Sequence, residues 1–127
     1  MEYEILTGKK ILIVEDDLAS RLYLNKILEK TGAILFNSGD GKDAVEVVRR
    51  NPDMDLILMD IQLPVMDGYA AAAEIKKLNN TTILIAQTAY GMQEDMDKII
   101  AGGFDGYIIK PIFSDQLTGK LSSFFKK

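Results

Sequence analysis

The chain contains neither cysteine nor histidine, and these two absences remove several kinds of site. Without cysteine there can be no disulfide bond and no thiol nucleophile. Without histidine there can be no His-based zinc site, no Ser–His catalytic triad and no phosphohistidine carried on this chain. The chemistry of the protein is therefore left to carboxylates, hydroxyls, lysines and the backbone.

Long apolar runs are also missing, and the charge balance is acidic. The uninterrupted apolar runs are a few residues long, far short of the roughly 20 residues that cross a bilayer. The chain starts with the acidic stretch Met1-Glu2-Tyr3-Glu4, unlike the basic start of a secretory signal. A formal net charge of -4 argues against direct binding of nucleic acid or of phospholipid headgroups. We therefore expect a cytoplasmic protein that binds neither membranes nor nucleic acid.

The length of 127 residues indicates one domain, residues 1–127, in which residues 1–8 precede the first strand as an extension. Short apolar runs rich in β-branched residues and bounded by Gly, Asp, Asn or Pro predict five strands. These runs are Lys10–Val14, Ala33–Phe36, Asp55–Met59, Thr82–Ala86 and Gly106–Ile109. Because the runs are continuous rather than alternating, the strands should form a parallel sheet with both faces covered by helices.

The segments between the strands have helical spacing and predict five helices. The first has an apolar face of Leu18, Leu22, Ile27 and Leu28 and ends before Gly32. The fifth should begin with Ser114 or Asp115 as its cap. A strand–helix order repeated five times predicts an α/β fold with a doubly wound parallel sheet.

Charged residues that could form a site follow three of the predicted strands. Glu15 and Asp16 follow the first strand, Asp60 the third and Lys110 the fifth. The carboxyl ends of parallel strands lie at one edge of the sheet, where such folds build their sites. Each like-charge pair of acids about 5 Å apart costs on the order of 3 kcal/mol at an effective dielectric constant near 20. Mg²⁺, with Mn²⁺ as a substitute, is the natural neutraliser, and an aspartate beside it can accept a phosphoryl group.

Each of these residues also has an ordinary structural explanation. An acid at a strand end, such as Asp17, often caps the next helix, and Asp60 beside a proline-containing loop suits a turn. Lys110 could be a surface lysine with its stem on the core. Thr88 could cap the fourth helix, and Tyr107 could reflect β-propensity alone. The joint occurrence of polar residues at four of five strand ends favours a functional site.

The chain resembles the receiver domains of two-component response regulators, the chemotaxis-type regulator fold. The resemblance covers essentially the whole chain and rests on four motifs: ILIVEDD (Ile11–Asp17), DLILMDIQLPVMDG (Asp55–Gly68), IAQTA (Ile85–Ala89) and GYIIKP (Gly106–Pro111). It implies a flavodoxin-like sheet with strand order 2-1-3-4-5. It also implies that Asp60 is the phosphoacceptor, charged by a phosphohistidine on a histidine kinase or histidine phosphotransfer protein. Glu15, Asp16, Asp60 and the backbone carbonyl of Gln62 would hold Mg²⁺.

The same resemblance assigns the residues of a conformational switch. Thr88 matches the switch hydroxyl, and the backbone N–H of Ala89 would bind a phosphoryl oxygen. Lys110 would pair with the phosphate through a cis bond to Pro111, and Tyr107 matches the aromatic switch position. The face formed by the fourth helix, fifth strand and fifth helix would then change shape and control the binding of a partner.

Two further positions bear on how long the phosphate persists. Gln62 and Tyr90 lie two residues after Asp60 and Thr88, at positions that tune dephosphorylation in this family. A bulky amide and a phenol there predict a longer phosphoryl lifetime than in fast chemotaxis regulators. The domain is thus expected to catalyse its own phosphorylation, from phosphohistidine or small phosphodonors, and a slow dephosphorylation, without being a conventional enzyme.

Other classes of function fit the sequence less well. An Asp-nucleophile phosphatase needs a second aspartate two residues after Asp60, but position 62 is glutamine. A flavin-binding domain needs a phosphate loop after the first strand, where Glu15, Asp16 and Asp17 would repel the phosphate. A phosphorylation-independent interaction domain stays open. So do a receiver within a hybrid histidine kinase that relays phosphate onward, and a homodimer.

Overall fold

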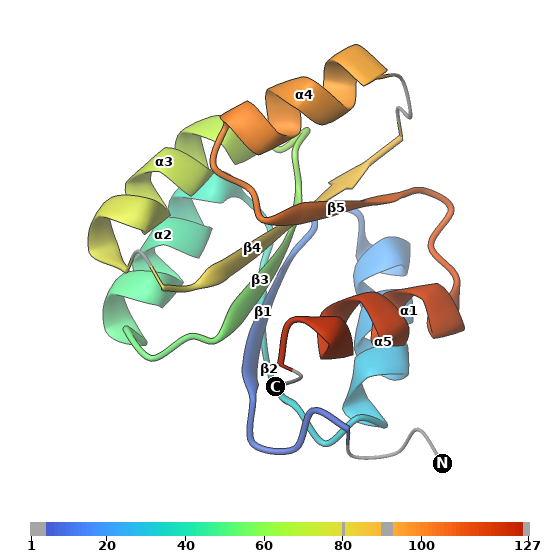
Figure 1. Cartoon of the computed structure of the whole chain (residues 1–127). Helices are drawn as coiled ribbons and strands as arrows, with labels where there is room; N and C mark the ends of the chain where they lie inside the picture. The colour runs from blue at the N-terminus through green and yellow to red at the C-terminus, as the bar shows by residue number, and fades with distance from the viewer. Residues whose placement is uncertain (1–4, 80, 90–92, 126–127) are drawn as a thin grey trace.

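A five-stranded parallel sheet with the strand order β2-β1-β3-β4-β5 forms the centre of the protein (Figure 1). The structure is a computed structural model that describes residues 5–79, 81–89 and 93–125. The strands are β1 (Lys10–Val14), β2 (Ile34–Ser38), β3 (Leu56–Asp60), β4 (Ile83–Thr88) and β5 (Gly106–Ile109). The predicted fold class and strand order are confirmed.

Five helices cover the two faces of this sheet (Figure 1). They are α1 (Leu18–Glu29), α2 (Gly41–Arg50), α3 (Gly68–Leu78), α4 (Gln93–Ala101) and α5 (Ser114–Ser123). Helices α2, α3 and α4 pack on one face, and α1 and α5 pack on the other. No helix in the described ranges is long and apolar enough to cross a membrane.

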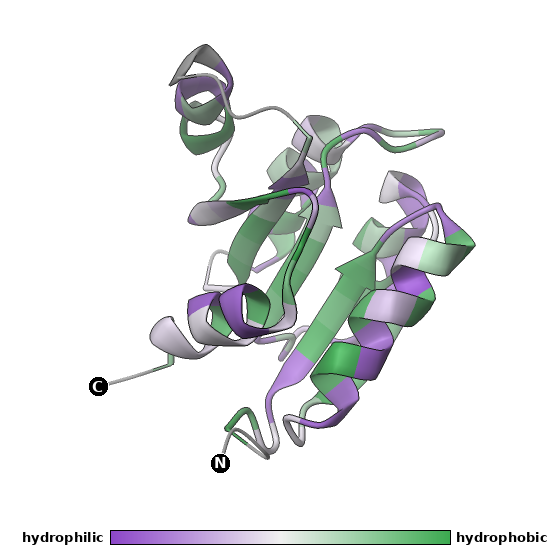
Figure 2. Cartoon of the chain, turned by 90° about the vertical axis from the view of Figure 1, so that its right-hand side faces the viewer, coloured by the Kyte–Doolittle hydropathy of each residue, from purple (hydrophilic) through white to green (hydrophobic). Residues whose placement is uncertain are grey.

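Side chains alternate between two apolar cores, one on each face of the sheet, because successive residues of a strand point to opposite faces. In β3, Ile57 and Met59 belong to the core beneath α2, α3 and α4. Leu56 and Leu58 belong to the core beneath α1 and α5. The apolar strands are green along the middle of the molecule in Figure 2, with mixed helices outside them. The same alternation decides to which face of the sheet each polar side chain at a strand end points.

Three local expectations are wrong in an informative way. The buried face of α1 consists of Leu24, Ile27 and Leu28, whereas Leu18 and Leu22 are 63% and 61% exposed. Helix α1 therefore has apolar residues on two of its faces, and only one of these faces packs against the sheet. Strand β2 lies at an edge of the sheet and is only partly buried, with Phe36 packed against one core and Leu35 against the other. Helix α5 begins after Phe113, whose side chain provides no capping hydrogen bond.

The first described residues pack against the domain ahead of β1. Leu6 is buried in the core beneath α1 and α5. Its backbone N–H donates a 2.9 Å hydrogen bond to the carbonyl of Thr31. Residues 5–8 are therefore tied to the turn between α1 and β2.

Candidate functional site

Glu15, Asp60 and Lys110 reach one face of the sheet because of the alternation along their strands. Each lies two residues after a residue of the core beneath α1 and α5, namely Ile13, Leu58 and Ile108. Residues two apart in a strand point to the same face. The ends of β1, β3 and β5 therefore bring two acids and a lysine together on the α1 and α5 side.

The acids form the predicted cluster. Glu15, Asp16 and Asp60 each offer a carboxylate oxygen within 4.8 Å of the other two. Glu15 is 1% exposed and Asp60 is 7% exposed, whereas Asp16 is open to solvent. Two buried carboxylates at this separation are costly unless they are paired. The cluster therefore needs a positive charge beside it, and Asp16 is its solvent-exposed member.

Lys110 supplies part of that charge. Its Nζ lies 2.9 Å from Oδ2 of Asp60 and 3.5 Å from Oε2 of Glu15. Its backbone N–H donates a 2.7 Å hydrogen bond to the carbonyl of Thr88, and the Lys110–Pro111 peptide bond is cis, as expected. Among the described residues, the three carboxylates of the cluster have one ammonium at ion-pair distance, which leaves a difference of two negative charges. A divalent cation carries the matching charge.

The second oxygen of Asp60 is fixed by the loop after β3. Oδ1 accepts a 2.8 Å hydrogen bond from the backbone N–H of Gln62. The start of α3 packs directly against this loop: a Cβ on Gly68 would lie 2.6 Å from Cα of Ile61 and 2.9 Å from the Asp60 carbonyl oxygen. Glycine is therefore required at position 68, and the close packing fixes the backbone of the loop that follows Asp60.

Burial and charge shift the pKa values of two members of the site. Desolvation, aided by the charge of Asp60, raises the pKa of Glu15 although the Asp17 N–H and Lys110 oppose it. Burial acts to lower the pKa of Lys110, but its hydrogen bond to Asp60 and the charges of Asp60 and Glu15 outweigh burial and raise that pKa. Lys110 therefore stays protonated at neutral pH and keeps its ion pairs with Asp60 and Glu15.

The raised pKa of Glu15 predicts how the metal-free protein responds to pH. Its pKa in the folded protein lies above the usual glutamate value of 4.5. Ionised Glu15 therefore destabilises the fold at neutral pH, and that cost disappears below pH 4.5. We expect Glu15→Gln to raise the Tm in the presence of a chelator at pH 7. The gain should vanish as the pH falls through 4.5. Thermal unfolding followed by circular dichroism measures both, and a gain that does not depend on pH would contradict this assignment.

The predicted switch residues lie on or beside the strands that carry the cluster. Thr88 is buried at the end of β4, directly after Gln87, which pairs with Asp60 in the sheet. Ala89 follows and is exposed. Tyr107 of β5 is half-buried against the core beneath α2, α3 and α4, with the Lys120 ammonium 5.5 Å from its ring centre. Tyr90 lies outside the described residues.

Asp17, in the first motif, caps a helix, which is the ordinary structural explanation for an acid at a strand end. The side chain of Asp17 accepts a 2.9 Å hydrogen bond from the backbone N–H of Ser20 and caps α1. Its pKa is lowered chiefly by that hydrogen bond. Asp17 therefore belongs to the helix, and Asp16 to the cluster.

Sequence reasoning missed two residues around the site. Arg21 of α1 donates from Nε and a terminal nitrogen to the carbonyl of Glu15, at 3.2 and 3.1 Å, and so fixes the loop that carries the acids. Gln87 of β4 is fully buried, and neither its Oε1 nor its Nε2 has a hydrogen-bond partner among the described residues. The sequence did contain one sign of Gln87, namely a glutamine inside an otherwise apolar strand.

The model of the response regulator receiver domain matches residues 11–122 of this chain. The chain belongs to the receiver domain family. The receiver is 39% identical to the chemotaxis protein CheY of Halobacterium salinarum over 104 residues, which cover 82% of this chain and 86% of that protein. It is 37% identical over 123 residues to two-component system protein A of Emericella nidulans, covering 95% of this chain but 18% of that protein. The chain thus spans under a fifth of that relative's length.

Solved structures agree with the family. One is the receiver domain of a sensor histidine kinase from Pseudomonas aeruginosa PAO1, with magnesium coordinated in its active-site cleft: TM-score 0.82, 32% identity, covering 92% of this chain and 97% of that one. Another is a complex of the Saccharomyces cerevisiae histidine phosphotransfer protein Ypd1 with the receiver domain of Ssk1: TM-score 0.83, 29% identity, covering 91% and 88%. The chain is therefore a receiver of two-component signalling.

Proposed function

We propose that this receiver is a phosphorylation-activated switch in which Asp60 accepts a phosphoryl group from a phosphohistidine. The observation that carries the proposal is the cluster of Glu15, Asp16 and Asp60 within 4.8 Å, with Lys110 bound to Asp60. In the transfer, an Asp60 carboxylate oxygen attacks phosphorus, the P–N bond breaks, and the imidazole nitrogen leaves with the bond's electron pair. The product is an acyl phosphate on Asp60.

The residues present fit a magnesium ion. Hard carboxylate and carbonyl oxygens are the ligands that Mg²⁺ favours, and the two uncompensated charges of the cluster match its charge. Asp16, Asp60 and the backbone carbonyl of Gln62 would hold the ion, with Glu15 beside them, and Mn²⁺ would fit the same oxygens. When bound, the cation neutralises charge on the phosphoryl group during transfer.

The chain's own groups position Asp60 and receive the new charge. The Gln62 N–H and the Lys110 ammonium each hold one oxygen of Asp60, so that the carboxylate does not need to be reoriented before it attacks. After transfer, Lys110 would pair with the phosphate, and Thr88 and the Ala89 N–H would bind its oxygens. Phosphorylation adds nearly two negative charges and three acceptors, enough to draw Thr88 toward the site.

Movement of Thr88 is the proposed link to the surface. Thr88 and Tyr107 occupy neighbouring strands, with Ala86 paired to Tyr107 and Thr88 to Ile109. A shift of Thr88 would change the space beside α4 and the position of Tyr107, and with it the face of α4, β5 and α5. A target that binds one shape of this face better would report the phosphate.

The proposal also includes the lifetime of the phosphoryl group and the cellular location of the receiver. Gln62 follows Asp60 at the exposed mouth of the site, where its amide can shield the acyl phosphate from water. We expect a phosphoryl lifetime longer than seconds, which the loss of label from purified phosphoprotein measures. The proposal includes a cytoplasmic location. A phosphorylation-independent role and onward relay within a longer kinase are the competing functions, and a homodimer is compatible with each of them.

An apolar surface beside the site suits a phosphodonor protein. Leu18, Leu22 and Tyr23 of α1 and Phe113 before α5 are large apolar side chains left exposed. They lie on the same side of the sheet as Asp60, and Tyr23 is joined to the segment before α5 by a 2.6 Å hydrogen bond to the Ile112 carbonyl. Exposed apolar groups gathered in one place mark interaction sites. The complex of the Ssk1 receiver with Ypd1 supports a partner of this kind.

Substitution of Leu22 separates docking from chemistry. Leu22→Ser should slow phosphoryl transfer from a phosphorylated histidine phosphotransfer protein by about tenfold or more, because burying a leucine side chain contributes roughly 1.5–3 kcal/mol. The rate with acetyl phosphate should not change. Ile100→Ser is the matched control, since Ile100 is similarly exposed (53%) but lies on α4. Equal slowing by both variants would refute this surface as the docking site.

The proposed function is tested with a small phosphodonor. Wild-type protein incubated with acetyl phosphate and Mg²⁺ should gain one phosphate, detected as a mass increase, and should gain none with excess EDTA. Beryllofluoride with Mg²⁺ should shift the NMR signals of Thr88 and Tyr107. Uptake that is independent of metal would contradict the proposed site, and no uptake from any donor would favour a phosphorylation-independent domain.

A further inference from the structure

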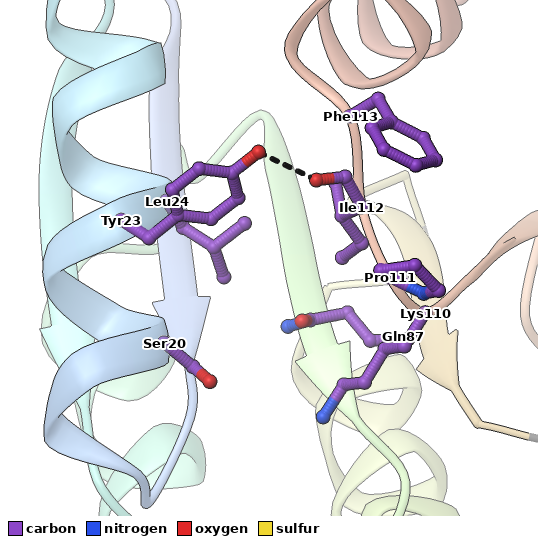
Figure 3. A pocket seen from close by; sticks show the side chains of 8 residues that line it. All are labelled: Ser20, Tyr23, Leu24, Gln87, Lys110, Pro111, Ile112 and Phe113. Carbon is purple, nitrogen blue, oxygen red and sulfur yellow. Dashed lines mark hydrogen bonds between the residues drawn. The ribbon is translucent and has the colours of Figure 1, made fainter.

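A pocket of about 310 Å³ lies between α1 and the segment that follows β5, on the α1 and α5 side of the sheet (Figure 3). Leu24 of α1 and Pro111, Ile112 and Phe113 supply apolar walls. The hydrogen bond from the Tyr23 hydroxyl to the Ile112 carbonyl crosses one end and joins the two walls. The volume lies at the lower end of the roughly 300–1,000 Å³ that is usual for small-molecule sites.

Gln87 of β4 forms the polar part of this pocket. Figure 3 shows its amide pointing into the space between α1 and the segment after β5, toward the side of the pocket where Ser20 lies. The side chain is 0% exposed, and neither Nε2 nor Oε1 has a partner among the described residues. Leaving both atoms unpaired is costly. A primary amide presents a donor and an acceptor side by side, so its complement is a group that does the same.

The charges near the pocket favour a neutral ligand. Lys110 lines the pocket, but its ammonium is held by Asp60 at 2.9 Å and by Glu15 at 3.5 Å. The remaining lining groups are apolar side chains, hydroxyls and the Gln87 amide. A charged ligand would lose its hydration without gaining an opposite charge, which is strongly unfavourable.

We propose that this pocket binds a small neutral molecule that has an apolar body and an amide-type edge, such as a primary carboxamide or a lactam. The ligand's N–H donates to Oε1 of Gln87, its carbonyl accepts from Nε2, and its body lies against Leu24 and Ile112. The site is distinct from the acidic cluster but shares Lys110 with it. Binding does not depend on phosphorylation of Asp60, so this proposal stands or fails separately from the proposed function.

The test uses benzamide as the probe and acetophenone, which has the same shape but no donor, as its control. In ¹⁵N- and methyl-labelled wild-type protein, benzamide should shift the side-chain NH₂ signal of Gln87 and the Leu24 methyls. Its Kd should be about tenfold lower than that of acetophenone, the factor that one ordinary hydrogen bond provides. Gln87→Met keeps the length of the side chain and should abolish the difference while raising the Tm.

A second variant leaves Gln87 in place. Ser20→Leu fills the pocket from the surface of α1 and should weaken benzamide binding. The proposal is overturned if neither probe perturbs Gln87 or Leu24. It is also overturned if the preference for benzamide survives in Gln87→Met, or if Ser20→Leu binds benzamide as well as wild type. A Gln87 signal that responds only to a histidine phosphotransfer protein would likewise overturn it, by making the pocket part of the docking surface.

Discussion

Replacing Asp60 with asparagine is expected to abolish phosphoryl uptake from acetyl phosphate and from a phosphohistidine donor. Asparagine keeps the shape of the side chain but lacks the carboxylate that attacks phosphorus. The variant should still fold, because Lys110 retains its contact with Glu15 and one of the crowded negative charges is removed. Mass spectrometry after incubation with acetyl phosphate and Mg²⁺ measures uptake.

Asp67→Asn is the matched control for this experiment. Asp67 lies near the site in sequence, and its side chain accepts a 2.9 Å hydrogen bond from the Ala70 N–H as the cap of α3. Asparagine is also a good cap, so this variant should take up phosphate at the wild-type rate. Uptake by Asp60→Asn at that rate would exclude Asp60 as the acceptor.

Asp16→Asn is expected to weaken Mg²⁺ binding by at least about tenfold. A divalent cation about 4 Å from a carboxylate gains roughly 2 kcal/mol even at the dielectric constant of water, and 1.4 kcal/mol corresponds to a factor of ten. Metal-dependent phosphorylation should fall with it. Isothermal titration calorimetry with MgCl₂ measures the affinity directly.

The neighbouring residue provides the control for Asp16. Asp17→Asn removes the same charge one position along the chain but preserves the cap of α1, whose hydrogen bond comes from the Ser20 N–H. Asp17 does not contribute to the cluster of three acids within 4.8 Å. Its substitution should therefore change the Mg²⁺ affinity much less. Equal losses in the two variants would mean that general charge, rather than ligation by Asp16, controls binding.

The metal-free stability of Asp16→Asn is a further part of this prediction. Removing an acid from a crowded cluster should raise the Tm in the presence of a chelator. Asp16 is exposed, so solvent screens its charge and the gain should be small. A lower Tm without metal would contradict the account of repulsion within the cluster.

The convergence of the acids was predictable from the sequence because it depends only on strand order and alternation. Glu15 and Asp60 follow apolar runs at the carboxyl ends of neighbouring parallel strands, and such ends meet at one edge of the sheet. The pairing of Lys110 with Glu15 was not predictable. It depends on the direction of the chain after β5, which the strand pattern does not contain.

Other expectations failed because a sequence pattern does not identify what an apolar residue packs against. Leu18 and Leu22 have helical spacing like Leu24 and Leu28, yet the first two face solvent and the last two face the core. The spacing shows that a face is apolar but not whether the sheet or a partner protein covers it. Gln87 was overlooked for the converse reason: a glutamine inside an apolar strand is a visible sign, but the sequence does not show the space in front of its side chain.

Locating the phosphate on the chain is the most direct test of Asp60 as the phosphoacceptor. Protein phosphorylated with acetyl phosphate and Mg²⁺ is treated with borohydride, which reduces the acyl phosphate of an aspartate to the alcohol of homoserine, and its peptides are analysed by mass spectrometry. We expect homoserine at position 60 and at no other acid. Homoserine at position 16 or 67, or its absence from protein that carries phosphate, would exclude Asp60 as the phosphoacceptor.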